Sequence, residues 1–289
     1  MIISVSRRTD IPRYHFDWFM ERVNEGFADV ANPFNAAQIK RISLKPGDVK
    51  FMVFWTRDPK KILETPGLSE KYRFYVMTTL TGYPKIIEPN APAKDDVIYT
   101  MKALAQRLGK NRVIWRYDPV FLTDLTDSAF HKRNFSELAS ALAGVTERVI
   151  ISIYDEYSGA KRRLSAMERE GQLRVLSHSG PQVTELITEL ARIANDAGIN
   201  IQSCAEDLTG CGVKMGACID SALINAITGE EQDKGRDRNQ RQACLCAQSV
   251  DIGVYGTCPA ECVYCYARRA VNNGVTKVSG NSGPRNSGT

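Results

Sequence analysis

The stretch DDVIYTMKALAQRLGKNRVIWRY, residues 95–117, decides the fold class because it places one helix directly before one strand. Apolar side chains recur every three or four residues from Asp95 to Leu108, which is the pattern of a helix that buries one face. Acids in the first turn and Gly109 after the last turn are start and stop signals for this helix. The strand around Val113-Ile-Trp115 is apolar on both faces, and such a strand after a helix indicates a parallel sheet covered by helices.

This unit of helix and strand repeats along the chain. Strands are expected over 2–5, 50–55, 73–79, 112–117, 149–154, 199–203 and 250–255, and 173–176 is a weaker eighth candidate. A second amphipathic helix is expected over 183–197, where Gly198 ends it. Seven or eight such units favour an α/β fold of the (β/α)8 TIM-like barrel type. The alternative is an open doubly wound sheet with a separate cysteine-rich domain.

The domain organisation follows from length and composition. With 289 residues, 43% of them hydrophobic, the chain is long enough to bury a full core. We expect one barrel domain over residues 1–278, which includes a cysteine-rich segment over 204–270. Residues 279–289 are rich in Gly and Ser, and they are expected to form a flexible tail.

The charge pattern bears on location and partners. Charged residues begin at Arg7, too early for a signal peptide, and no apolar stretch is long enough to span a membrane. We therefore expect a cytoplasmic protein without a membrane partner. In that reducing compartment, clustered cysteines indicate metal or redox chemistry rather than disulfides. The net charge of +5 is spread among interleaved acids, so it gives only a weak signal for a nucleic-acid partner.

All eight cysteines lie in the last third of the chain, and three of them form the loop Cys258-Pro-Ala-Glu-Cys262-Val-Tyr-Cys265. Three thiolates at this C-x3-C-x2-C spacing can hold three irons of a 4Fe-4S cluster and leave the fourth iron open for chemistry. The alternative is a zinc knuckle. Zinc sites, however, usually pair cysteines as C-x2-C and close a tetrahedron of four protein ligands.

Polar residues follow the expected strands, where a barrel enzyme has its active site. The catalytic candidates are Asp10, Arg116 and Glu206, and the candidates for cofactor binding are Arg7 and Arg8. Each of them, taken singly, is also explained as a helix cap or a solvated loop residue. Arg116 still lies within the strand pattern, so its charge needs a partner. We expect a carboxylate such as Asp118, Glu156 or Asp10, in either a structural ion pair or a substrate clamp.

The strand over 249–256, the cysteine loop and a helix that begins over 266–270 together resemble the cluster-binding unit of radical S-adenosylmethionine enzymes. The resemblance implies that Cys258, Cys262 and Cys265 hold a 4Fe-4S cluster whose open iron binds the amine and carboxylate of S-adenosylmethionine. It also places Tyr264 beside the adenine, whereas the alternative for Tyr264 is a core aromatic residue. In that family the unit opens the barrel. Here it comes last, which implies a circularly permuted barrel in which residues 2–5 form the family's second strand.

Over nearly its whole length the chain also resembles a bacterial and archaeal family known as domain of unknown function 1848. The resemblance rests on Ser6-Arg-Arg-Thr-Asp-Ile-Pro12, Phe54-Trp-Thr-Arg57, Ser203-Cys-Ala-Glu206 and Cys244-Leu-Cys246. These motifs are specific as a set and weak singly. The family has no assigned reaction, so membership implies the architecture and the cluster rather than a substrate.

Four of the remaining cysteines are candidates for a second metal site: Cys204, Cys218, Cys244 and Cys246. Four thiolates can bind a second 4Fe-4S cluster or a structural zinc ion, and Cys211 is then spare. The alternative is that Cys204 and Cys218 are ordinary buried thiols. The C-x-C pair favours the metal site.

Two functional hypotheses follow. The first is a radical S-adenosylmethionine-type enzyme that acts on a small molecule or a nucleic acid, with an electron donor such as flavodoxin or ferredoxin. Nucleic-acid repair or modification would use a set of basic residues, namely Arg236, Arg238, Arg241, Arg268 and Arg269. The second hypothesis is a non-catalytic iron–sulfur or zinc-binding sensor or carrier protein.

Overall fold

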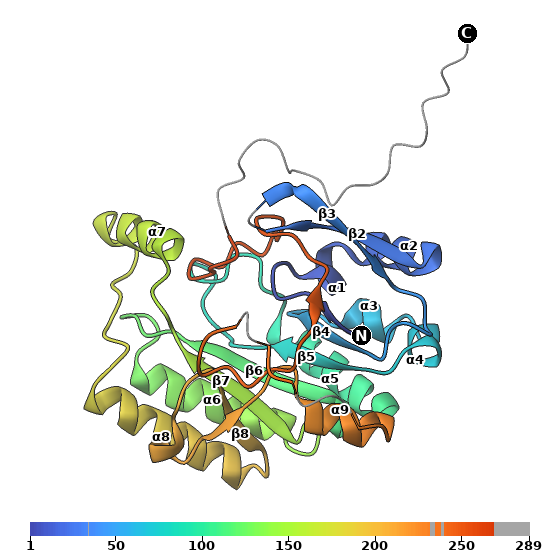
Figure 1. Ribbon diagram of the computed structural model, residues 1–289. Coiled ribbons are helices and arrows are strands. Elements are labelled where there is room, and N and C mark those ends of the chain that lie inside the picture. Colours follow the sequence, from blue (N-terminus) through green and yellow to red (C-terminus); the bar gives the residue numbers. More distant parts are fainter. Residues whose placement is uncertain (34, 232–234, 238–239, 269–289) are drawn as a thin grey trace.

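Eight parallel strands form one sheet in the computed structural model, which describes residues 1–33, 35–231, 235–237 and 240–268 (Figure 1). The order across the sheet is β10-β1-β4-β5-β6-β7-β8-β9. The strands are β1 (Ile2–Val5), β4 (Phe51–Thr56), β5 (Phe74–Thr79), β6 (Val113–Val120), β7 (Arg148–Ile153), β8 (Asn200–Cys204), β9 (Lys214–Gly216) and β10 (Val250–Asp251). The expected α/β class with a parallel sheet is confirmed. The last strand of the chain, β10, lies beside the first, β1, and from β1 onward the strands follow chain order.

Helices connect these strands. They are α1 (Ile11–Tyr14), α2 (Phe16–Glu25), α3 (Lys60–Leu63), α4 (Gly67–Lys71), α5 (Lys94–Leu108), α6 (Ser128–Leu142), α7 (Ser158–Arg169), α8 (Pro181–Asp196) and α9 (Ser221–Thr228), with short 3-10 turns η1 (Lys110–Arg112) and η2 (Thr209–Cys211). The two helices expected from sequence correspond to α5 and α8. No helix in the described part of the chain is long and apolar enough to cross a membrane.

The outer face of the sheet packs against helices. Phe54, Val76 and Trp115 point to this face from three neighbouring strands, and they share one core cluster with apolar residues of α2, α5, α6 and α8. Trp115 stacks on Phe135 of α6 with ring centroids 4.7 Å apart. Its indole nitrogen donates a hydrogen bond to the carbonyl of Leu80 at 2.9 Å, so the buried ring leaves no unpaired donor.

The inner face forms a second core cluster. It contains side chains of β1, β4, β5, β6 and β7, namely Ile2, Phe51, Tyr75, Ile114 and Ile150, together with Cys218, Ile224 and Cys246. The Tyr75 hydroxyl donates to the Cys218 carbonyl at 2.5 Å and accepts from the Asp220 backbone N–H at 3.2 Å. Cys218 follows β9, which forms the edge of the sheet opposite to β10. The chain after β9 therefore folds back across the inner face as far as β5.

An antiparallel hairpin of β2 (Phe27–Asn32) and β3 (Asn35–Ser43) forms a separate two-stranded sheet. In Figure 1 it lies at the top of the molecule, above the helix α1. No pattern in the sequence predicted this hairpin.

The eighth strand is the main correction to the expected elements. Residues 173–176 form only an isolated bridge between Thr123 and Val175, and β9 is the strand that pairs with β8 instead. The strand expected over 250–255 ends at Asp251. Gly253 packs so closely on Ser6 that an added Cβ would lie 2.0 Å from the Ser6 hydroxyl, which leaves no space for a regular strand with side chains.

Two further expectations concern the C-terminal end. Residues 266–268 are not helical, so the helix expected from 266 does not begin there, and residues 269–270 lie outside the described residues. The tail over 279–289 also lies outside them.

The hydrogen bonds that join Tyr75 of β5 to the backbone of Cys218 and Asp220 are testable with Tyr75→Phe. We expect the variant to lower the free energy of unfolding by about 1–3 kcal/mol, because it leaves a buried carbonyl and a buried N–H without a partner. Urea unfolding measures the change, and Tyr99→Phe is the control because Tyr99 is 72% exposed. Equal stability of Tyr75→Phe and the wild-type protein would contradict the bond.

Candidate functional site

The cysteine loop lies at the carboxyl ends of the strands, next to an aromatic cluster. Cys258, Cys262 and Cys265 all belong to or pack on one core cluster, which includes Tyr83, Phe121 and Tyr264. The charges of Cys258 and Cys265 both act on the pKa of Cys262, which burial raises to about 12. The three thiols therefore share one environment of low polarity. In the described part of the chain, no group of three or more His, Cys, Asp or Glu side chains is arranged to hold a metal ion as it stands.

Side chains from distant segments hold this loop in place. Arg163 of α7 donates to three loop carbonyls, those of Val263 at 3.1 Å, Cys265 at 2.6 Å and Arg268 at 3.1 Å. His15 lies 3.0 Å from the Thr257 carbonyl through its Nε2 atom. Further bonds join the Val263 N–H to Ile87 and the Asn90 amide to Pro259. The loop thus has a fixed shape without regular secondary structure.

Asp10 holds backbone groups that lie next to the cysteine loop. Its carboxylate caps α1 by accepting from the Arg13 N–H at 3.2 Å, and it accepts from the Arg57 N–H at 2.8 Å. Burial raises the pKa of Asp10. The Asp10 and Ala260 backbone N–H groups both donate to Cys258, which opposes the rise that burial causes in the pKa of this thiol. Asp10 therefore positions Arg57 and Cys258.

Arg57 and Glu88 form a buried ion pair beside Cys262. Two guanidinium nitrogens of Arg57 donate to the two Glu88 oxygens at 2.8 and 2.9 Å, and the Glu88 side chain is 1% exposed. The Tyr264 hydroxyl donates to Glu88 at 2.5 Å and accepts from Arg57 at 2.5 Å. The positive charge of Arg57 opposes the rise of the Cys262 pKa. A cavity of about 220 Å³, lined by Arg57, Glu88 and residues 79–83, opens next to this pair.

Arg57, which follows β4, was not among the site residues predicted from the sequence. Glu88 and Arg163 were not predicted either. Arg57 had a usable signal, since it comes two positions after the expected apolar strand 50–55. Glu88 lies in a segment between β5 and α5 that has no regular pattern, so no sequence signal distinguished it.

Arg116 pairs with Asp118, as expected, and the Asp118 carboxylate also accepts from the Ser152 hydroxyl. The guanidinium carbon of Arg116 lies 4.8 Å from the ring centroid of Trp55, and that of Arg7 lies 5.9 Å from the same ring. Two buried donors here, Arg116 Nε and Trp55 Nε1, have no hydrogen-bond partner in the described structure. Donors of this kind suit a ligand that carries hydrogen-bond acceptors.

Arg7 and Arg8 flank the end of β10. The Arg7 guanidinium lies 3.7 Å from the Asp251 carboxylate, while Arg8 donates to the Gly253 carbonyl at 3.2 Å and lies over the Tyr255 ring at 5.3 Å. Arg8 therefore holds the start of the cysteine loop. The Tyr266 hydroxyl donates to the Arg7 carbonyl at 3.0 Å, which brings the end of the loop to the same place.

Glu206 follows β8, directly after Ala205, whose φ of 59° is uncommon for a residue with a side chain. Its carboxylate accepts from the Ile153 N–H at 3.0 Å. Burial raises the pKa of Glu206 to about 7, and the charge of Asp155 adds to the rise while Arg241 opposes it. A carboxyl group with this pKa is suited to proton transfer near neutral pH.

Four thiols gather on the inner face, away from the loop. The Cys218 thiol donates to the Cys204 sulfur at 3.1 Å, and Cys244 and Cys246 belong to the same core cluster as Cys218. The bond from Cys218 lowers the pKa of Cys204. Cys211 lies in η2 and packs against the outer core instead.

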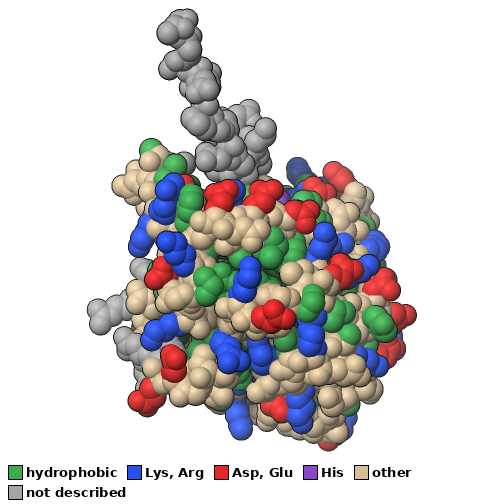
Figure 2. Space-filling view, turned by 90° about the vertical axis from the view of Figure 1, so that its right-hand side faces the viewer, with side chains coloured by type: hydrophobic (Ala, Val, Ile, Leu, Met, Phe, Trp, Pro, Cys, Tyr) green, Lys and Arg blue, Asp and Glu red, His purple; other side chains and the backbone are tan. Residues whose placement is uncertain are grey.

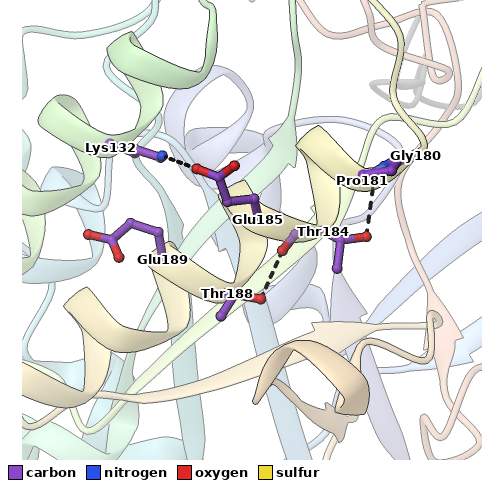
Figure 3. Close-up of a pocket in the computed structure, with 7 residues that line it drawn as sticks. All are labelled: Lys132, Gly180, Pro181, Thr184, Glu185, Thr188 and Glu189. Carbon is purple, nitrogen blue, oxygen red and sulfur yellow. Dashed lines mark hydrogen bonds and ion pairs between the residues drawn. The ribbon is translucent and has the colours of Figure 1, made fainter.

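A shallow hollow on the surface of α8 involves none of these candidates (Figure 3). It has a volume of about 750 Å³ and is lined by Lys132, Gly180, Pro181, Thr184, Glu185, Thr188 and Glu189. Its polar groups bond within the hollow: Lys132 pairs with Glu185 at 2.9 Å, and the Thr188 hydroxyl donates to the Thr184 carbonyl at 2.8 Å. We assign no function to it.

Comparisons with known proteins place the chain in a family but not in a reaction class. The family model described as "Domain of unknown function (DUF1848)" matches residues 2–267. The curated proteins contain no match. Among solved structures, a D-hydantoinase is 10% identical at a TM-score of 0.32, with 58% of this chain and 38% of that chain covered. The D-hydantoinase from a Bacillus sp. AR9 is 9% identical at 0.31, with 55% and 34% covered. This chain thus matches little more than a third of either protein, and likeness of this degree carries no argument.

The buried pair of Arg57 and Glu88 is testable by a double-mutant cycle. We expect Arg57→Met to lower the free energy of unfolding by about 3–5 kcal/mol, because Glu88 would be left buried without a cation. Adding Glu88→Gln should restore part of the loss, since the uncompensated charge is removed. Chemical denaturation gives all four values, and additive effects of the two substitutions would contradict the pair.

The raised pKa of Glu206 predicts a dependence of stability on pH. Because the folded pKa of about 7 exceeds the ordinary value of 4.5, the stabilising effect of the protonated group is full below about pH 4.5 and is lost as the pH rises through about 7. We therefore expect wild type to lose stability relative to Glu206→Gln across that range. Denaturation at a series of pH values measures the difference. The control is Glu189→Gln, because Arg192 lowers the pKa of Glu189 and moves its effect below this range.

Proposed function

This chain belongs to the family described as domain of unknown function DUF1848, and we propose that it is an iron–sulfur enzyme of the radical S-adenosylmethionine type. Because the family description names no reaction, the proposal rests on the site. The observation that carries it is the cysteine loop. Cys258, Cys262 and Cys265 share one apolar environment at the carboxyl ends of the strands, and the loop that bears them is held by side chains of other segments.

The residues of the loop fit a 4Fe-4S cluster. Three thiols provide ligands for three irons and leave one iron open. Backbone N–H groups donate to Cys258, and Arg57 lies beside Cys262, and both features stabilise thiolates. When bound, such a cluster supplies one electron to S-adenosylmethionine, whose cleavage yields methionine and a 5′-deoxyadenosyl radical that abstracts hydrogen from a substrate.

The unpaired donors on the inner face support a site for a ligand that bears a carboxylate. Arg116 Nε and Trp55 Nε1 have no hydrogen-bond partner in the described structure, and the Arg7 guanidinium lies over the same indole ring. We propose that these groups bind the cofactor or the substrate and that Glu206 transfers a proton. Arg8 and Asp10 hold the loop. The Tyr264 ring is 7% exposed and bonded to Glu88, so we propose that Tyr264 contacts the adenine through its backbone.

The sheet order supports a circularly permuted (β/α)8 barrel. Read across the sheet, the unit of β10 and the cysteine loop comes first and β1 comes second, which is the order that the resemblance to radical S-adenosylmethionine enzymes requires. Side chains of five neighbouring strands meet in one inner cluster, as they do inside a barrel. The segment 204–268 supplies part of this inner layer.

The setting of the enzyme is also proposed. We place it in the cytoplasm, with flavodoxin or ferredoxin as electron donor and a small molecule or a nucleic acid as substrate. Figure 2 shows Lys and Arg interspersed with Asp and Glu on one face of the molecule, which does not favour nucleic acid there. Of the basic residues considered for that role, Arg241 pairs with Asp155, and Arg238 and Arg269 lie outside the described residues.

One observation favours the alternative of a sensor or carrier protein without catalysis. Several polar groups at the strand ends are already paired: Arg57 with Glu88, Arg116 with Asp118, and Asp10 with backbone N–H groups. Groups bonded in this way can hold a fold without binding a substrate.

Anaerobic purification followed by cofactor cleavage separates the two functions. We expect about four irons and as many sulfides per chain, and slow reductive cleavage of S-adenosylmethionine to methionine and 5′-deoxyadenosine. Replacing Cys258, Cys262 or Cys265 by alanine should abolish both iron binding and cleavage, whereas Cys211→Ala should preserve them. A fully loaded, reduced protein that forms no 5′-deoxyadenosine would favour the carrier, as would a loop that binds zinc, and a loop with neither iron nor zinc would overturn both.

A further inference from the structure

The four thiols on the inner face come from three separate segments of the chain. Cys204 ends β8, Cys218 follows β9, and Cys244 and Cys246 lie on the approach to β10. Cys218, Cys244 and Cys246 are between 3% and 5% exposed. The Cys218 thiol donates to the Cys204 sulfur at 3.1 Å, and Cys244 and Cys246 belong to the same core cluster as Cys218. Packing of small apolar groups does not require four sulfurs to meet, because any apolar side chain would fill the space.

The surroundings of the sulfurs include a backbone donor and a cation. The Ile219 N–H donates to the Cys246 sulfur at 3.4 Å. The Arg7 guanidinium lies 5.9 Å from the ring centroid of Trp55, and Trp55 belongs to the same core cluster as Cys218, Cys244 and Cys246. Cys204 packs against that cluster. Backbone donors and guanidinium groups near sulfur favour negative charge.

We propose that Cys204, Cys218, Cys244 and Cys246 bind a single Zn²⁺ ion as a tetrahedral tetrathiolate site. Binding would release the thiol protons to solvent as four Zn–S bonds form, and the resulting net charge of 2− would face Arg7 and Arg116. The site goes beyond the proposed reaction and does not depend on it.

The separation of Cys204 and Cys218 favours one ion over a 4Fe-4S cluster. With Zn–S bonds of about 2.3 Å, the sulfurs of a tetrahedral site lie about 3.8 Å apart. The distance of 3.1 Å between Cys204 and Cys218 needs to open only slightly to reach that value. In a 4Fe-4S cluster each thiolate binds a different iron, so the sulfurs stand farther apart than hydrogen-bonded thiols. Among the described residues no group of three or more such side chains is already placed around a metal position, so binding would draw the four sulfurs together.

The proposed ion would fix the segment that covers the inner face. Cys218 precedes Asp220, which caps α9 through its carboxylate and bonds Arg148 of β7 at 2.6 Å. Cys246 is followed by Ala247, whose N–H donates to the Ile219 carbonyl at 2.9 Å. Linking these two stretches to β8 would hold the inner layer of the sheet beneath Arg7 and Arg116. The role is structural.

Metal analysis of a variant that lacks the loop ligands tests the site independently of the proposed function. We expect full-length Cys258→Ser/Cys262→Ser/Cys265→Ser, grown with zinc and purified anaerobically, to retain about one zinc per chain without sulfide. Adding Cys246→Ser should reduce zinc at least tenfold, and adding Cys211→Ser should not. Absence of zinc in the triple variant, or zinc retained after Cys246→Ser, would overturn the proposal. Iron with sulfide in the triple variant would show a second cluster and would equally overturn it.

A second measurement remains decisive if Cys246→Ser fails to fold. Co²⁺ added to the chelator-treated triple variant should give the intense visible bands and the thiolate-to-metal charge-transfer band of tetrahedral sulfur ligation. One equivalent of Zn²⁺ should displace the Co²⁺ and remove both the visible bands and the charge-transfer band. A spectrum of octahedral Co²⁺, without charge transfer, would show that the four thiols do not bind one ion. Failure of S-adenosylmethionine cleavage in wild type has no bearing on this result.

Discussion

The placement of the cysteine loop depends on one carboxylate, that of Asp251. It accepts hydrogen bonds from the Ser4 hydroxyl at 2.8 Å, the Ser6 hydroxyl at 2.5 Å, and the backbone N–H groups of Arg7 at 2.8 Å and Gly253 at 2.9 Å. Strand β10 has only two residues, so ladder bonds alone hold it weakly to β1. Bonds to a charged acceptor contribute roughly 1.5–3 kcal/mol each, which makes this carboxylate the main link between the last strand and the first. The cysteine loop comes directly after β10 in the chain, so its position depends on that link.

With β10 fixed beside β1, the end of the cysteine loop and the inner thiols both come close to Arg7. The Tyr266 hydroxyl, just after the loop, donates to the Arg7 carbonyl, while the charge of the Arg7 side chain acts on Cys218 and Cys246. The guanidinium groups of Arg7 and Arg116 both lie near the Trp55 ring, and the charge of Arg116 acts on Cys204. The residues that follow β1 thus connect two groups of cysteines that are separate in sequence.

The sequence predicted what depends on local patterns and missed what depends on distant contacts. Strand β1 was predicted to the residue. A charge in a buried strand needs a partner, and Asp118, one of the three carboxylates expected for Arg116, is that partner. Strand β9 has three residues and no apolar pattern, so the more apolar 173–176 was preferred, although it makes only one bridge. Neither the role of Asp251 nor that of Glu88 has a local signal, because Ser6 and Arg57, which link them to other strands, lie more than thirty positions away.

The distribution of positive charge ties these features together. The net charge of +5 gave only a weak signal for a nucleic-acid partner, and several arginines act on the cysteine segments instead. They are Arg57 at Cys262, Arg163 at the carbonyl of Cys265, and Arg7, Arg116 and Arg241 at the inner thiols. Buried cations are costly unless an anion accompanies them. Carboxylates supply that anion for four of these five arginines, because Arg57 pairs with Glu88, Arg116 with Asp118, Arg7 with Asp251 and Arg241 with Asp155. Part of the positive charge of the chain is thus paired within the fold, next to the cysteines.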